Sequence, residues 1–111
     1  MNQTPVTKSY TFKGKLWKYK APSAWHFVTL PLSLSTKIRK NHSDSEEGWG
    51  RLKALATTGS SSWKTAIWYD TKIKSYLLPI KSPIRKKELL KTGRTLSVKL
   101  EIEHERWGEE E

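Results

Sequence analysis

The sequence LPLSLSTKIRK at residues 30–40 returns in a shorter form as LPIKSPIRKK at residues 78–87. In each copy Leu-Pro follows an aromatic or β-branched run, leads into a basic helical turn, and is followed by Gly-Arg and another apolar run. Proline at a strand exit costs no ladder donor, and glycine supplies the backbone angle needed to leave a helix. The repeat predicts two related halves, and because the spacers differ in length the alternative is a coincidence.

Alternation of apolar and polar residues with a period of two dominates the rest of the chain. In TLSVKLEIE at 95–103 the apolar side chains are Leu96, Val98, Leu100 and Ile102, which is the pattern of an antiparallel strand with one wet face. The same period starts at Tyr10 and continues through Phe12 and Leu16. With the aromatic and β-branched runs, this predicts six strands, from Tyr10 onward and at 25–30, 51–58, 62–70, 74–80 and 95–103.

Two helices are expected between strands. Ser82 is a suitable cap, Pro83 fits the first helical position, and Gly93 can supply a left-handed residue at the end. A weaker helix is expected around 33–41, with Ser33 or Ser35 as its cap. The fold class is therefore all-β with one or two short helices, a small split β-barrel built from two pseudo-twofold related halves. Its expected core is Phe12, Leu16, Phe27, Ile67, Leu78, Leu96, Val98 and Leu100.

Length and composition fit one domain. We expect a flexible N-terminal segment at 1–9, a single barrel domain at 10–103 and a disordered acidic tail at 104–111. The chain of 111 residues has a net charge of +10, yet its last eleven residues hold six Glu, so residues 1–100 carry 20 basic and 5 acidic side chains. A field of one sign favours anionic partners. The chain has no cysteine, no apolar run that could span a bilayer and no apolar signal core, so we expect a cytoplasmic protein without a membrane partner.

The chain resembles a bacterial family called domain of unknown function 1905. The resemblance rests on FKGKL, WHFVTLP, GWG, SWKTAI and LPIKSPIRKK, which together span most of the sequence. It implies a shared fold and carries no functional residues, because the family has no assigned activity. A weaker resemblance, over residues 78–100, is to the swapped-hairpin barrels of AbrB-like regulators, although Arg94 follows the Gly where those proteins have an acidic residue. It implies that this chain supplies both barrel halves as a monomer, and fold alone does not confer DNA binding.

Basic residues cluster after each Leu-Pro copy. A solvated face is one interpretation, and structural roles for Arg39 and Arg85 are another. A third is a nucleic-acid or anion-binding surface, which the pseudo-twofold would assemble from Lys37, Arg39, Lys40, Lys81, Arg85, Lys86, Lys87, Lys91 and Arg94.

Six tryptophans are more than a small core needs. Trp63 and Trp68 fall on opposite faces of one predicted strand, so an aromatic surface or pocket is expected from Trp49, Trp63 and Trp68, unless most of the tryptophans are scaffold. Bases stack on exposed aromatic rings while lysine and arginine hold phosphates.

Catalytic constellations are scarce. The histidines, His26, His42 and His104, are not placed beside a nucleophile by any motif. His42, Asp44 and Glu46 alternate in a polar segment, which we interpret as a solvated loop and not as a cation site. We expect no enzyme activity, no cofactor and no metal. The leading hypothesis is a binding module for nucleic acid or another polyanion; an acidic protein is also a possible partner. The alternatives are a protein-interaction or small-ligand barrel, and an enzyme.

Overall fold

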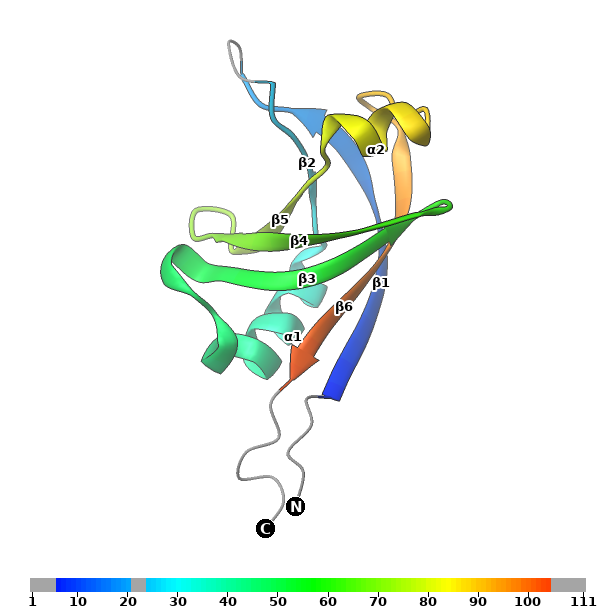
Figure 1. The fold of residues 1–111 in the computed structure, drawn as a ribbon. Coiled ribbons are helices and arrows are strands. Elements are labelled where there is room, and N and C mark those ends of the chain that lie inside the picture. Colours follow the sequence, from blue (N-terminus) through cyan, green and yellow to red (C-terminus); the bar gives the residue numbers. More distant parts are fainter. Residues whose placement is uncertain (1–5, 21–23, 105–111) are drawn as a thin grey trace.

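Six antiparallel strands close into a barrel with two short helices at its ends in the computed structural model of the chain (Figure 1). The structure describes residues 6–20 and 24–104. The strands are β1 (Val6–Lys18), β2 (His26–Thr29), β3 (Arg51–Thr58), β4 (Ser61–Asp70), β5 (Ser75–Pro79) and β6 (Thr95–His104). Their order around the barrel is β1-β2-β5-β4-β3-β6. The helices are α1 (Leu32–His42) and α2 (Ser82–Lys87), and two 3-10 turns, η1 (Ser43–Ser45) and η2 (Gly48–Gly50), lead from α1 to β3. All six predicted strands and the mainly-β class are confirmed.

Apolar and polar side chains alternate along strands such as β6, so the apolar ones face the inside of the barrel and form the core. On β6 the side chains of Leu96, Val98, Leu100 and Ile102 are buried, as the period of two predicts. Seven of the eight expected core residues are buried. The prediction for Phe27 is wrong, because its neighbour Val28 takes the inward position on β2 and turns Phe27 to the outer face. None of the described helices is long and apolar enough to cross a membrane.

The two halves of the chain are related by a pseudo-twofold. The units β1-β2-α1-β3 and β4-β5-α2-β6 have the same order of elements, and exchanging β1 with β4, β2 with β5 and β3 with β6 leaves the ring order unchanged. Every pairing has its counterpart: β1 pairs with β2 and β6, as β4 pairs with β5 and β3. The repeated sequence therefore marks a repeated structure.

Backbone hydrogen bonds between β2 and β5 refine the alignment of the two halves. The Leu30 N–H donates to the Tyr76 carbonyl, and the Ile80 N–H donates to the His26 carbonyl, both at 2.9 Å. Leu30 thus corresponds to Ile80, two residues beyond Leu78. The two Leu-Pro copies fall in equivalent regions but not at equivalent positions, since Pro31 precedes α1 directly while Pro79 still belongs to β5. A shift of two residues keeps the same side chains on the inner face.

Both helices differ in detail from expectation. The weaker prediction gives the longer helix, α1, and neither Ser33 nor Ser35 caps it; Ser35 is buried and its hydroxyl accepts a hydrogen bond from the Tyr76 N–H at 3.0 Å. The N-cap of α2 is Lys81, so Ser82 is already helical. Helix α2 stops at Lys87, well before Gly93, because Leu89 takes the left-handed conformation with φ of 55°. Gly93 has a positive φ in the turn into β6 instead.

Candidate functional site

The two helices cover opposite ends of the barrel (Figure 1). Each helix directly follows its strand, and because β2 and β5 are antiparallel neighbours, their exits point in opposite directions. We call these the α1 end and the α2 end. The expected single patch is therefore not formed: Lys37, Arg39 and Lys40 lie at the α1 end, away from the α2 end with Lys81, Arg85, Lys86, Lys87, Lys91 and Arg94.

At the α1 end, Arg39 is occupied within the fold. Its guanidinium carbon lies 3.8 Å from the centre of the Tyr69 ring, and one of its nitrogens lies 3.8 Å from a carboxylate oxygen of Glu46. The Tyr76 hydroxyl donates a hydrogen bond to the same carboxylate, and the Tyr69 and Tyr76 rings meet edge to face at 5.1 Å. Burial, and secondarily the Glu46 carboxylate, raises the pKa of Tyr76 well above its usual value. Arg39 thus braces this end, as one interpretation of the sequence proposed.

His42 belongs to the same end and is not part of an exposed loop. It is the last residue of α1, it is buried, and its Nε2 lies 2.8 Å from the Tyr10 hydroxyl, which accepts a hydrogen bond from the Asn41 amide at 3.2 Å. Within residues 6–20 and 24–104, no three His, Cys, Asp or Glu side chains gather in a way that could hold a metal ion. The contacts of His42 and Asn41 with Tyr10 join the end of α1 to β1.

At the α2 end, five of the six predicted cations are exposed: Lys81, Lys86, Lys87, Lys91 and Arg94. Arg85 is half-buried, and its Nε has no hydrogen-bond partner among the described residues. The carboxylate of Glu88 accepts hydrogen bonds from Ser60 in the β3–β4 turn and from Ser61 at the start of β4. The bond from Ser61 is the main reason that the pKa of Glu88 lies below its usual value. Because Glu88 is held by these serines, the lysines on α2 remain available to an outside anion.

Four aromatic side chains form a cluster on the β1–β2 hairpin: Trp17, Tyr19, Trp25 and Phe27. The Trp25 ring is stacked on Phe27 at 5.8 Å with an interplanar angle of 7°, and Trp17 lies 5.2 Å from Phe27. The Trp17 indole N–H donates to the Thr29 hydroxyl at 2.9 Å. Trp25 is 58% exposed and Tyr19 is 55% exposed, which leaves flat aromatic surface open to a ligand.

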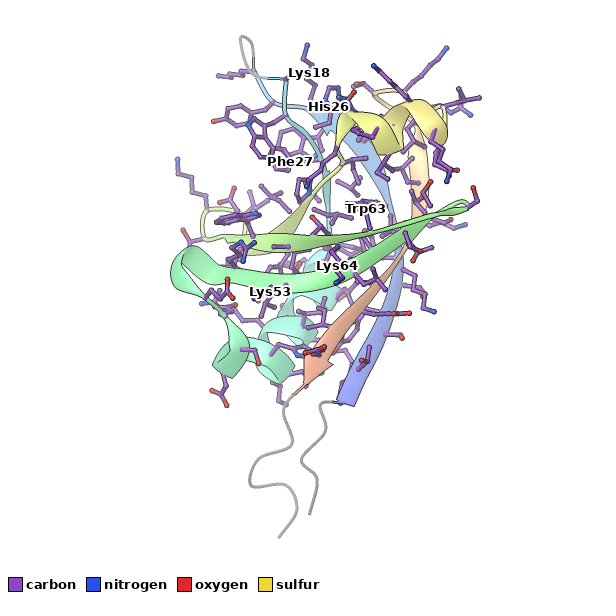
Figure 2. All side chains as sticks on the ribbon, in the orientation of Figure 1. Lys18, His26, Phe27, Lys53, Trp63 and Lys64 are labelled. Atoms are coloured by element: carbon purple, nitrogen blue, oxygen red, sulfur yellow. The ribbon has the colours of Figure 1, made fainter. Side chains whose placement is uncertain are left out.

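The aromatic cluster belongs to the α2 end. The Ile80 N–H bonds to the His26 carbonyl, so Lys81 and the start of α2 lie next to Trp25 and Phe27. Lys18 and Lys20 are exposed on the same hairpin, and Figure 2 shows Lys18, His26 and Phe27 at the barrel end that α2 covers. Exposed rings and exposed cations thus occupy one end of the molecule.

The tryptophans expected to form an aromatic surface or pocket lie elsewhere. Trp63 faces the barrel interior and packs half-buried against the core. Trp68 is on the outer face, 38% exposed, with the Arg51 guanidinium 5.6 Å from its ring. The side chain of Trp49 lies outside what the structure describes. The sequence did not predict the cluster on β1 and β2. Alternation alone puts Trp17 on the outer face, because its neighbour Leu16 faces inward, and it puts Trp25 on the same face as Phe27. That the two strands pair, and so bring these rings together, is known only from the register.

A groove runs over the outer face of the barrel from the aromatic cluster and encloses about 820 Å³. Trp25 and Lys81 line it at the α2 end, and Trp68 lines it further along with Lys53 and Lys64. Lys53 and Lys64 lie on the outer side of β3 and β4 (Figure 2). Towards the α1 end the lining becomes acidic, with Glu101 and Glu103 of β6. Glu47 also lines the groove, where Arg51 donates a hydrogen bond to its carboxylate and the Lys53 nitrogen lies 3.5 Å away.

The fold defines the class of protein: a small closed barrel of six strands with a short helix at either end. The family model described as domain of unknown function (DUF1905) matches residues 12–100, and the chain belongs to this family. The sequence resemblance is thereby confirmed, whereas the weaker one to AbrB-like barrels stays a resemblance. No curated protein matches the chain.

Proposed function

We propose that this protein binds nucleic acid through its α2 end. The observation that carries the proposal is the exposed aromatic cluster beside the exposed lysines of α2 and of the β1–β2 hairpin. An aromatic ring offers a stacking surface to any base, and lysines neutralise phosphates without reading sequence. Binding of this kind is weakly sequence-specific and depends strongly on salt.

The α1 end is a poorer candidate for the same ligand. Its arginine is already engaged with Tyr69 and Glu46. Asp44, Glu46 and Glu47 follow directly on α1, and a phosphate chain would be repelled by them. We expect the protein to bind as a cytoplasmic monomer.

Fluorescence anisotropy with labelled random-sequence DNA and RNA over a salt series tests the proposal. We expect the logarithm of the affinity to fall linearly with the logarithm of the salt concentration. Changing Lys86 and Lys87 together to Ala should make this negative slope shallower by about 1.4 to 1.8, because two phosphate contacts are lost. The matched control, Lys37→Ala with Lys40→Ala, removes the same charge at the α1 end and should leave the slope nearly unchanged.

Trp25→Ala should act differently, since it removes a stacking surface and no charge. We expect binding to weaken by about 1 to 3 kcal/mol with the salt slope retained. Equal losses of slope in the two lysine double variants would mean that the charge acts diffusely and not at the α2 end. Failure to bind any nucleic acid at low salt, with intact melting curves, would refute the proposal and leave the exposed aromatic cluster as a surface for a protein partner.

A further inference from the structure

We infer that the ligand is a single strand of nucleic acid, and that it continues from the aromatic cluster along the groove, past Trp68 on β4, to Lys64 on β4 and Lys53 on β3. This inference rests on the proposed function. It adds the form of the ligand, its path over the barrel and the side chains it meets beyond the α2 end.

Continuity of the groove is the first support. Trp25 and Lys81 belong to the α2 end and line the same groove as Trp68, Lys53 and Lys64. A nucleic-acid strand held at the aromatic cluster therefore meets a groove with a second exposed ring, Trp68, and two further exposed lysines, Lys53 and Lys64. The groove lies on the outer strand faces, so its floor is rigid sheet and not loop.

The spacing of the two aromatic sites favours an unpaired strand. Phe27, on which Trp25 stacks, pairs with Pro79 of β5, and Trp68 pairs with Leu77 of the same strand. With strands about 4.8 Å apart and residues rising about 3.4 Å, the Cα atoms of Phe27 and Trp68 are roughly 12 Å apart. Bases inside a duplex are stacked at about 3.4 Å and hide their faces, so two aromatic sites on backbone positions this far apart can each take a base only from a nucleic-acid strand that is unstacked.

The charged side chains that line the groove indicate where the nucleic-acid strand would run. Lys64 is exposed beside Lys53, because Lys64 pairs with Leu55 and Lys53 pairs with Ala66 on the outer face of β3 and β4. Glu47 holds Arg51 and Lys53 in ion pairs, and a phosphate entering the groove competes with this carboxylate for them. Glu101 and Glu103 make the α1 end of the groove unfavourable for phosphates, so the path ends before β6.

Length dependence with matched variants tests this path. Oligothymidylates of about four and about twelve nucleotides bracket the site sizes of small barrel domains. We expect the long strand to bind more tightly than the short one, and more tightly than a duplex of equal length. Lys53→Ala with Lys64→Ala should weaken the long strand by about tenfold and leave the short one unchanged, because the short strand occupies only the aromatic cluster. Glu47→Gln should tighten the long strand, and Asp44→Asn, which removes the same charge outside the groove, should not.

The outcomes separate this inference from the proposed function. If the short strand binds and the Lys53 and Lys64 changes do not affect the long one, the groove is not the path, and the function at the α2 end stands. Tighter binding of duplex than of single strand overturns the inference in the same way. If neither strand binds at low salt, both fall. Lys53 and Lys64 are exposed, so unchanged melting curves for their double variant show that a loss of binding is not a loss of fold.

Discussion

Tyr76 shows how one buried phenol stabilises the α1 end. Its side chain is fully buried, its hydroxyl donates to Glu46, and its backbone N–H donates to the Ser35 hydroxyl. The Tyr69 ring covers it from the side and Arg39 covers Tyr69. Burial is the main reason that the pKa of this phenol is raised, because ionisation would leave a charge away from water; the neighbouring Glu46 carboxylate raises the pKa further.

Tyr76→Phe should therefore change the response of stability to alkaline pH. The folded pKa lies above the unfolded value of about 10, so the contribution is fully present below pH 10 and is lost as pH rises, at up to about 1.4 kcal/mol per pH unit. Chemical denaturation between neutral pH and pH 11.5 should show a shallower fall for the variant than for the native chain. At neutral pH the variant should lose about 1 to 3 kcal/mol, because Glu46 loses a donor.

The matched control is Tyr19→Phe, which removes the hydroxyl of an exposed tyrosine. It should reproduce the native pH dependence and the native stability. Identical alkaline slopes for Tyr76→Phe and the native chain would show that the phenol of Tyr76 ionises as freely in the folded protein as in the unfolded one.

Among the elements, α2 has an unusual end. Leu89 is left-handed without being glycine, with the Leu89 N–H donating to the Lys86 carbonyl at 3.3 Å and the Leu90 N–H donating to the Arg85 carbonyl at 2.8 Å. This is the hydrogen-bond pattern of a Schellman motif, in which glycine is the usual left-handed residue. The Leu89 side chain is 80% exposed, so little burial compensates for its backbone strain.

Leu89→Gly should consequently stabilise the protein by about 0.5 to 1 kcal/mol, since the relief of left-handed strain exceeds the added entropy of the unfolded chain. Thermal or urea unfolding measures the change. Leu32→Gly is the control: Leu32 is also exposed, but it lies in the first turn of α1, and the same substitution should destabilise by up to about 1 kcal/mol. A fall in melting temperature for both variants would contradict the strain at Leu89.

At the scale of the whole molecule, the pseudo-twofold relates the start of β1 and the end of β6 to an internal hairpin. Val6 of β1 pairs with His104 of β6, and the equivalent pairing of β4 with β3 ends in the turn between Thr58 and Ser61. A turn joins β3 to β4 at one of these two places, whereas β1 and β6 are the first and last described strands at the other. The twofold relation predicts that the barrel does not depend on which of the two places is joined.

A circular permutant in which a linker joins the end of β6 to the start of β1 and the chain is opened between Gly59 and Ser60 should fold to the same barrel. Its order of elements, β4-β5-α2-β6-β1-β2-α1-β3, repeats the native order with the halves exchanged. We expect the native circular dichroism spectrum and a single cooperative unfolding transition. Opening between Thr65 and Ala66 is the control, because it cuts β4 where it pairs with β3. Loss of folding in the first permutant as well as the second would show that the two halves are not interchangeable.

Sequence patterns predicted the strands well, because alternation such as Leu96 to Ile102 is dictated by one wet and one dry face. The repeat also predicted the two halves. The end of α2 was misplaced, since Gly93 is a stronger signal for a left-handed residue than Leu89. The separation of Lys37 from Lys87 depends on β2 and β5 being antiparallel neighbours, and the aromatic cluster depends on the pairing of Trp17 with Phe27. Neither pairing can be read from one strand alone.

The pseudo-twofold also affects how the two ends can change under mutation. In a barrel assembled from two copies of one polypeptide, each substitution appears twice, and a residue suited to one end must be tolerated at the other. Here both halves are encoded in one gene, so each end can be selected separately. Arg39 is committed to Tyr69 and Glu46 at one end, while Lys86 and Lys87 stay exposed at the other. Covalent joining of the halves thus permits the two ends to differ, with a braced arginine at one and exposed lysines at the other.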